Sequence, residues 1–182
     1  VLYGVYERRL VASLDRTRIP RHVGVILDGN RRWAADQGSS TAHGHRAGAA
    51  KIEDLLGWCE EVDVEVVTLW LLSTDNLERP AVELDPLLAI IEETVTGLAS
   101  HGTWRVHPVG ALDLLPARTA EVLKKAGADT AERTGFIVNV GVGYGGRREV
   151  VDAVRALLAD HAARGTTLDD LAAAVDVEHI AE

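Results

Sequence analysis

The sequence predicts an α/β fold in which an open, mostly parallel sheet carries helices on both faces. Short apolar runs rich in β-branched residues alternate with longer segments whose apolar residues recur every three to four positions. Such alternation is typical of parallel sheets, because each strand-to-strand crossover needs a connecting helix. The chain has 182 residues, 47% of them hydrophobic and 26% charged, which suits a single domain over 1–182 with a sizeable core.

The first half of the chain is predicted from apolar spacing and from turn residues. The residue before Pro20 is pushed out of the helical region, so a first helix ends there. Leu55, Leu56 and Cys59 continue a helical spacing that begins at Ile52. In chain order we expect an amphipathic helix within 1–20, a strand over 22–27, a turn at 28–30, a short helix from Arg31, a loop over 37–44, a helix over 45–61, a strand over 64–72 and an exit turn over 73–76.

The second half continues the same alternation. Pro108 places the third strand at an edge of the sheet, because proline cannot donate to a ladder of hydrogen bonds. Pro116 suits the first turn of a helix. In chain order we expect a helix over 84–98, a strand over 104–109, a helix over 116–128, a strand over 136–142, a turn over 143–146, a helix over 147–163 and a short last helix capped by Thr166-Thr167.

Charge and cysteine content exclude several classes of protein. The net charge is −9, so general nucleic-acid binding is not expected. The first 32 residues nevertheless carry seven arginines against three acidic residues, which leaves a local positive charge suited to a small anion. The single cysteine, Cys59, allows no internal disulfide and indicates a reducing, cytoplasmic compartment. No apolar run reaches transmembrane length and no signal peptide is visible.

The strongest candidate site follows the first predicted strand, because ligands of open α/β sheets bind beyond the carboxyl ends of the strands. Gly29 allows close approach of a ligand to the backbone, and the amides of a helix start attract an anion. Arg31 and Arg32 suit phosphate oxygens. Asp28 does not fit an anion site unless a cation lies between them, so the residues indicate a diphosphate with Mg²⁺. The structural alternative is that Asp28 caps the helix and both arginines face solvent.

Four motifs in the same order resemble the signatures of the cis-prenyltransferases, the Z-isoprenyl diphosphate synthases. The first is His22-Val-Gly-Val-Ile-Leu-Asp-Gly-Asn-Arg-Arg-Trp33, and the second is Gly44-His-Arg-Ala-Gly48. The third is Ser73-Thr-Asp-Asn-Leu-Glu-Arg-Pro80, and the fourth is Tyr144-Gly-Gly-Arg147. The resemblance covers roughly residues 20–150.

The resemblance implies the condensation of isopentenyl diphosphate with an allylic diphosphate to give a cis double bond, with Mg²⁺ as cofactor and usually in a homodimer. It assigns the metal and catalytic role to Asp28 and a second catalytic role to Asn76. Because an amide is a poor base, we expect Asn76 to orient a water or the leaving diphosphate. The substrate-binding residues that it implies are Gly29, Asn30, Arg31, Arg32, Trp33, His45, Ser73, Thr74, Asp75, Leu77 and Arg79. Trp33 as core and His45 as a helix cap are the structural alternatives.

The sequence departs from the family pattern in several places. Thr41 stands where many members have a phosphate-binding arginine, Asp75 replaces a glutamate, and Leu77 replaces an aromatic residue. The family also has a C-terminal strand and an Arg-x-Ser-Gly-Glu-x-Arg-x-Ser motif, which these residues lack. There is no methionine at a natural start either, so we expect a fold and an active site that are incomplete on the C-terminal side.

Product length is predicted from the end of the second strand. Each added isoprene unit gains roughly 4 kcal/mol by burial, at about 0.8 kcal/mol per CH₂, so only a steric plug stops elongation. Leu71 and Leu72 stand where long-chain members have alanine and phenylalanine. We therefore expect a short product such as (2Z,6E)-farnesyl diphosphate made from geranyl diphosphate, as in actinobacterial members. A longer, decaprenyl- or undecaprenyl-type product is the alternative, and only that product implies peripheral membrane association. Leu71 as plain core is the structural alternative.

Other classes of protein fit less well. A trans-prenyl synthase needs Asp-Asp-x-x-Asp motifs, and a dinucleotide-dependent oxidoreductase needs Gly-x-Gly-x-x-Gly after the first strand; neither is present. A non-catalytic subunit of a heteromeric cis-prenyltransferase remains an alternative. Such subunits tend to lose the catalytic carboxylate and amide, whereas this chain keeps Asp28 and Asn76.

Overall fold

The structure, a computed structural model, describes residues 2–167 and 169–170. It divides into two compact units, Val1–Gly143 and Tyr144–Glu182. The first unit holds the sheet and the candidate site, and the second holds one long helix. The single catalytic domain over 1–182 stays a prediction.

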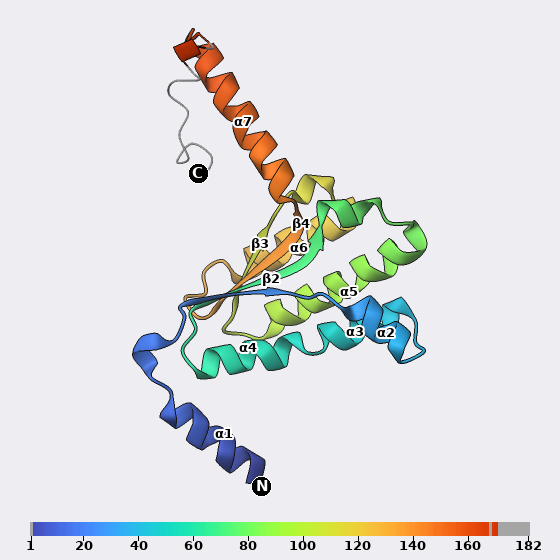
Figure 1. The fold of residues 1–182 in the computed structure, drawn as a ribbon, viewed down its shortest axis with the longest axis vertical. Helices are drawn as coiled ribbons and strands as arrows, with labels where there is room; N and C mark the ends of the chain where they lie inside the picture. Colours follow the sequence, from blue (N-terminus) through green and yellow to red (C-terminus); the bar gives the residue numbers. More distant parts are fainter. Residues whose placement is uncertain (1, 168, 171–182) are drawn as a thin grey trace. The chain divides into compact units, whose positions relative to one another are not determined.

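The elements alternate as the sequence predicts (Figure 1). The helices are α1 (Leu2–Ser13), α2 (Asn30–Asp36), α3 (Thr41–Ala49), α4 (Ile52–Glu61), α5 (Ala81–Ser100), α6 (Ala117–Thr130) and α7 (Gly146–Ala163). The strands are β1 (His22–Ile26), β2 (Val66–Ser73), β3 (Arg105–Val109) and β4 (Ile137–Tyr144). Three 3₁₀ turns, η1 (Arg16–Arg18), η2 (Thr74–Glu78) and η3 (Leu112–Leu114), join them.

The strands form one sheet in the order β1-β2-β4-β3. β1 pairs in parallel with β2, and β3 pairs in parallel with β4. In this order β3, which contains Pro108, is an edge strand, as predicted. Because the paired strands are parallel, the carboxyl ends of β1 and β2 lie at the same edge of the sheet, where Figure 1 places α2, α3 and the start of α5.

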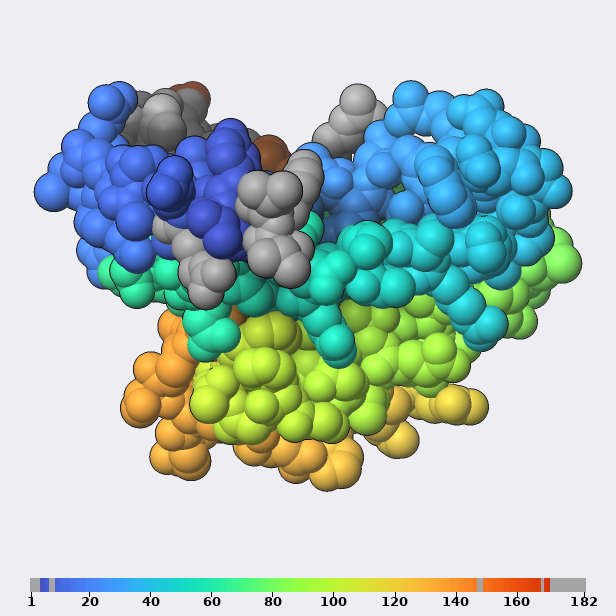
Figure 2. All heavy atoms as spheres, turned by 90° about the horizontal axis from the view of Figure 1, so that it is seen from below, coloured from blue at the N-terminus to red at the C-terminus, as the bar shows by residue number. Residues whose placement is uncertain are grey.

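One face of the sheet is sealed by α4, α5 and α6. Figure 2 shows α4 and α5 side by side along the molecule. The apolar side chains of these helices and of β2 and β4 form a single buried cluster. Its fully buried members include Leu56, Val67, Leu69, Val95 and Leu123. The strands therefore alternate between this core and the other face, and helices on that second face stay a prediction.

The second face carries a row of polar side chains that crosses all four strands. His22 Nε2 lies 2.7 Å from Thr68 Oγ1, which accepts a hydrogen bond from Asn139 Nδ2 at 3.1 Å. Asn139 Oδ1 in turn lies 3.2 Å from His107 Nδ1. Next to this row, Trp70 covers Gly141 so closely that a Cβ there would lie 2.7 Å from the indole ring. The second face is thus built for specific contacts rather than for general apolar packing.

Several boundaries differ from the prediction for local reasons. The helix expected over 45–61 is two helices that break around Ala50 and Lys51, and α3 already begins at Thr41 inside the expected loop. The cause is Ser40, whose hydroxyl accepts from the His43 amide and caps α3. The first helix ends at Ser13 instead of Pro20, because Asp15 caps the separate turn η1.

The last predicted helix falls mostly outside the described residues. Its expected cap is present, because the Asp170 amide donates to Thr167 Oγ1 at 3.2 Å. The long helix predicted over 147–163 is α7.

Candidate active site

The candidate site begins where β1 turns into α2. Gly29 is the N-cap of α2 and has a φ of 89°, a conformation that favours glycine. Asp28 stands just before it, and its Oδ1 accepts from the Gly29 amide. Its Oδ2 lies 3.3 Å from Arg32 Nη2, with both side chains 79% exposed. The carboxylate and the guanidinium therefore both face solvent at the carboxyl edge of the sheet and are free to turn toward a ligand.

The position of α2 is fixed by contact with α3 at two glycines. A Cβ on Gly44 would lie 2.3 Å from the Asn30 carbonyl oxygen, and one on Gly48 would lie 2.4 Å from Asn30 Oδ1. Asn30 Nδ2 donates to the Leu27 carbonyl at 3.3 Å. The Asn30 side chain thus lies between helices and ties the turn together, and its contact with a substrate stays a prediction. The two glycines of the second motif, Gly44 and Gly48, permit this close packing of α3 against α2.

The segment after β2 forms the opposite wall. Arg79 Nη2 donates to Asn76 Oδ1 at 2.8 Å, so the amide oxygen of Asn76 is already engaged. No hydrogen bond from the Asn76 amino group to another residue is present in the described part of the chain. The amide therefore has donors to offer a ligand while its oxygen already accepts from Arg79, which favours an orienting role over that of a base.

A residue that the motifs did not single out connects the two walls. Glu83, in the first turn of α5, lies 3.1 Å from Arg79 Nη1 and 3.4 Å from Arg31 Nε through the same Oε1 atom. The side chains of Arg79 and Glu83 are only 21% and 20% exposed. The contact between Arg79 and Glu83 could have been expected from the sequence, because Glu83 stands four residues after Arg79, a spacing at which ion pairs form. The contact with Arg31 joins segments far apart in the chain, and sequence alone does not indicate it.

His45, on α3, is held next to this group. Its Nε2 atom is buried and has no hydrogen-bond partner among the described residues. Burial lowers the pKa of His45, with further lowering by the charges of Arg79 and Arg31, against an opposing effect of Glu83. The imidazole is therefore neutral at neutral pH, and its orphaned nitrogen is suited to a hydrogen bond with a bound ligand.

The remaining predicted residues are placed more loosely. Trp33 is 45% exposed and stacks on His43, with ring centroids 5.9 Å apart, so it does not line an enclosed pocket here. Leu77 packs partly against the core. Ser73 and Thr74 are half-buried and Asp75 is exposed along η2.

The two chain-length candidates differ in how deeply they are buried. Leu72 is fully buried and belongs to the same apolar cluster as Val67 and Leu69, whereas Leu71 is only partly buried and packs against that cluster. Leu71 therefore keeps some accessible surface near the end of β2, and Leu72 keeps none. Their role in chain length stays a prediction.

A metal ion would have one carboxylate from this part of the chain. Within the described residues there is no group of three or more histidine, cysteine or acidic side chains able to hold a metal. An exposed aspartate beside a phosphate-binding region still fits Mg²⁺, which is commonly held by one or two carboxylates together with substrate phosphates and waters. The donor set therefore suits a magnesium ion that arrives with a diphosphate.

Comparison with known proteins identifies the family. The family model described as putative undecaprenyl diphosphate synthase matches residues 26–181. Isoprenyl transferase 1 of Streptomyces avermitilis is 57% identical over 180 residues, which are 99% of this chain and 70% of the relative. The (2Z,6E)-farnesyl diphosphate synthase of Thermobifida fusca is 64% identical over 167 residues, which are 91% of this chain and 65% of the relative. The chain thus spans about two thirds of the length of such relatives.

More distant relatives agree. A (2Z,6E)-farnesyl diphosphate synthase of Mycobacterium tuberculosis is 46% identical over 185 residues, which are 100% of this chain and 71% of the relative. A crystal structure of lavandulyl diphosphate synthase from Lavandula x intermedia, in complex with dimethylallyl diphosphate, superposes with a TM-score of 0.78 at 26% identity, covering 90% of this chain and 70% of that one. The predicted family and α/β fold are confirmed: the chain belongs to the undecaprenyl diphosphate synthase family of prenyl-transferring enzymes, the cis-prenyltransferases.

Proposed function

We propose that the protein joins isopentenyl diphosphate to an allylic diphosphate, with geranyl diphosphate as primer and (2Z,6E)-farnesyl diphosphate as product. The observation that carries this proposal is the arginine pair Arg31 and Arg79, held at one carboxylate beside the exposed Asp28. Relatives that are 64% and 46% identical bear the name of this farnesyl diphosphate synthase.

The chemistry requires that a diphosphate leave the allylic carbon before C4 of isopentenyl diphosphate attacks and a C2 proton is lost. Charge builds up on the departing oxygens, and fixed donors stabilise it. Arg31, Arg32 and Arg79 would bind the phosphate oxygens. The amino group of Asn76 and the free Nε2 of His45 would orient the leaving group. Asp28 would hold Mg²⁺, which supplies Lewis-acid stabilisation of the diphosphate when bound.

The chain-length part of the proposal rests on Leu71. Forcing a growing chain past a side chain that already packs against the core costs about 1–3 kcal/mol or more by overpacking. That cost offsets most or all of the gain from burying a further isoprene unit, which favours release of a short product. Leu71→Ala is expected to lengthen the main product by at least one isoprene unit, measured by chromatography of the dephosphorylated products. Leu72→Ala is the matched control, because that side chain is fully enclosed in the core and offers no surface to a growing chain. Equal product length for wild type and Leu71→Ala would contradict the plug.

We further propose a cytoplasmic homodimer with Mg²⁺ as cofactor and no nucleic-acid partner. Among the described residues, no helix has both the length and the apolar character needed to cross a membrane. Peripheral membrane association is expected only if the product proves long.

The deciding test is an assay of the full-length gene product with radiolabelled isopentenyl diphosphate and dimethylallyl, geranyl or farnesyl diphosphate, with and without Mg²⁺. A fifteen-carbon product from geranyl diphosphate is expected. Products of about fifty carbons would keep the family and refute the short chain. No turnover with any primer would favour the non-catalytic subunit, against which the retained Asp28 and Asn76 argue.

A further inference from the structure

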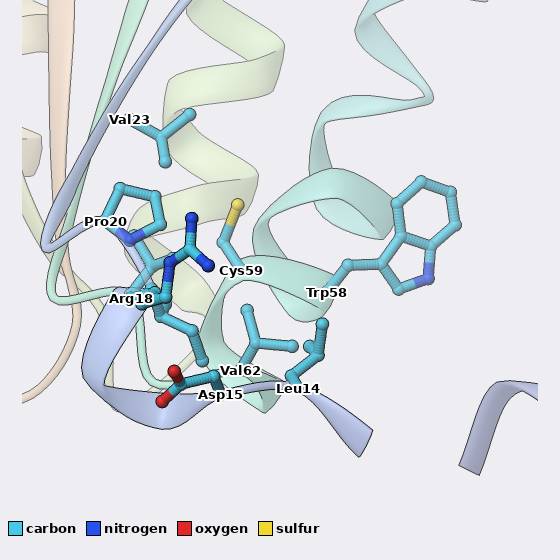
Figure 3. Close-up of a pocket in the computed structure, with 10 residues that line it drawn as sticks. Leu14, Asp15, Arg18, Pro20, Val23, Trp58, Cys59 and Val62 are labelled. Carbon is cyan, nitrogen blue, oxygen red and sulfur yellow. The ribbon is translucent and has the colours of Figure 1, made fainter. Parts of the chain in front are cut away.

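The groove in Figure 3 lies outside the candidate active site, between the linker before β1 and the end of α4. Its lining holds one carboxylate, Asp15, and one guanidinium, Arg18, and is otherwise apolar. Because these two charges cancel, the groove does not select a ligand by charge. The charges around Glu83, in the candidate active site, do not cancel, and they bear on the form in which a diphosphate can bind.

Around Glu83, three guanidinium groups are paired with two carboxylates. Glu83 Oε1 lies 3.1 Å from Arg79 Nη1 and 3.4 Å from Arg31 Nε. On the exposed wall, Arg32 Nη2 lies 3.3 Å from Asp28 Oδ2. Three positive and two negative groups leave one positive charge. The Glu83 carboxylate therefore cancels half of the charge that Arg31 and Arg79 would otherwise offer to phosphate oxygens.

The neighbouring side chains do not make this region more positive. His45 adds no charge, because burial lowers its pKa and the imidazole is neutral at neutral pH. The acidic side chains on the surrounding segments outnumber the basic ones. On α2, α3, η2 and the start of α5, the further acidic and basic residues are Asp36, Arg46, Asp75, Glu78 and Asp85. The described part of the site therefore offers at most one unit of positive charge to a ligand.

Glu83 differs from Asp28 because its carboxylate cannot turn away from a ligand. Its side chain is 20% exposed and contacts two guanidinium groups, whereas Asp28 is 79% exposed. A diphosphate that binds Arg31 and Arg79 would lie beside the Glu83 carboxylate, and like charges so close together in a partly buried place repel each other. A metal-free prenyl diphosphate carries about three negative charges at neutral pH and meets this repulsion in full. Mg²⁺ cancels two of those charges.

We propose that Glu83 makes the candidate active site select the magnesium complex of a diphosphate over the metal-free diphosphate. The complex carries about one negative charge, which matches the single positive charge that the paired groups leave. Asp28 would bind the metal ion, and Glu83 would make diphosphate binding depend on it. The inference rests on the proposed function, because it takes the bound diphosphate to be that of a prenyl substrate.

The test is calorimetric titration of the full-length protein with inorganic diphosphate and with the thiolodiphosphate analogue of geranyl diphosphate, which resists loss of its diphosphate. Each titration is made in EDTA and in Mg²⁺, and the ratio of the two dissociation constants is compared between variants. Glu83→Gln is expected to tighten metal-free binding about tenfold or more and to change binding with Mg²⁺ less than about threefold, so the ratio falls.

Two control variants separate charge from position. Glu83→Asp keeps the charge and shortens the reach, so its ratio should stay within about threefold of wild type. Glu78→Gln removes an exposed carboxylate from η2 and should change either dissociation constant less than about twofold. Circular dichroism confirms that each variant is folded.

Two results would overturn the inference. If Glu83→Gln weakens binding equally with and without Mg²⁺, Glu83 only positions the two arginines. If Glu83→Asp lowers the ratio as much as Glu83→Gln does, the cause is geometry and not charge. Because these titrations need no turnover, a Glu83-dependent ratio in a protein that transfers no prenyl group would refute the proposed function and leave the selection of the magnesium complex standing. Turnover together with an unchanged ratio would do the reverse.

Discussion

The two walls of the candidate active site differ in how firmly their charges are held. On one wall, Arg79 is mostly buried and uses both ends of its guanidinium, on Glu83 and on Asn76. On the other wall, Asp28 and Arg32 are 79% exposed and lie 3.3 Å apart. The side chains of the first wall are therefore fixed before a ligand binds, whereas those of the second wall are free to reorient when a ligand binds.

This difference suits a reaction in which a diphosphate departs. Hydrogen-bond donors that are already fixed stabilise developing charge without first having to reorganise. Such stabilisation is usually the largest single contribution to catalysis. A metal ion that enters with its substrate, by contrast, needs a carboxylate that can still rotate to bind it. Glu83 links the two walls, because one of its oxygens contacts an arginine from each, while Asp28 and Arg32 stay exposed.

The largest expected effect tests the open wall. Asp28→Asn keeps the shape of the side chain and removes its charge, so Mg²⁺ loses its only protein carboxylate in this part of the chain. We expect kcat with Mg²⁺ to fall about 1,000-fold, the upper part of the range seen when one transition-state contact is removed. The measurement is steady-state turnover of the full-length enzyme. Asp36→Asn, at the far end of α2, is the control. Activity of Asp28→Asn within tenfold of wild type would disprove the metal role of Asp28.

The second prediction concerns the close packing of α3 against α2, which positions the exposed wall of Asp28 and Arg32. Gly44→Ala places a methyl group against the Asn30 backbone, which cannot move without displacing α2. The free energy of unfolding should fall by about 2 kcal/mol, a typical cost of overpacking. Gly57→Ala is the control, because nothing lies within 4 Å of a Cβ at that helical position. Urea denaturation should show Gly57→Ala equal to or slightly more stable than wild type; equal loss in both variants would contradict the close packing.

The third prediction removes the link between the walls. Glu83→Gln keeps the length of the side chain but releases the charge that holds Arg31 and Arg79. We expect kcat to fall about tenfold, as for the loss of one charge-assisted contact, while KM stays unchanged or decreases because the site becomes more positive. Glu78→Gln, which removes an exposed carboxylate from η2, serves as control. A rise in KM without a change in kcat would show that Glu83 binds substrate and does not position the arginines.

The smallest expected effect is a pH dependence of stability carried by His45. Because its pKa is lowered in the folded protein, the unfolded chain binds more protons below about pH 6.5. The contribution of His45 to stability is therefore complete above that pH and is lost as the pH falls toward its folded value. Urea midpoints at pH 7.5 and 5.5 should differ less in His45→Gln than in wild type. An unchanged difference would show that His45 does not titrate with folding.

Much of the fold could be predicted because hydrophobic spacing reports the alternation of strands and helices. Boundaries were wrong where a short polar side chain acts locally, as with Ser40 at the start of α3 and Asp15 at η1. The site residues were predicted from motifs, which identify residues but do not show what their side chains contact. For Asn30, for example, the motif suggests a phosphate contact but gives no sign that its side chain packs between α2 and α3. Glu83 was missed because one of its two partners, Arg31, is distant in sequence.

The polar row across the sheet has a consequence for how the strands are aligned. It runs from His22 on β1 through Thr68 and Asn139 to His107 on β3, and so ties both edge strands to the centre. If an edge strand slipped by one residue, its histidine would turn to the opposite face, because strand side chains alternate. The row would then be broken and a polar ring pressed into the apolar core. These four side chains therefore act as a register lock, which fixes where β1 ends and hence where Asp28 emerges.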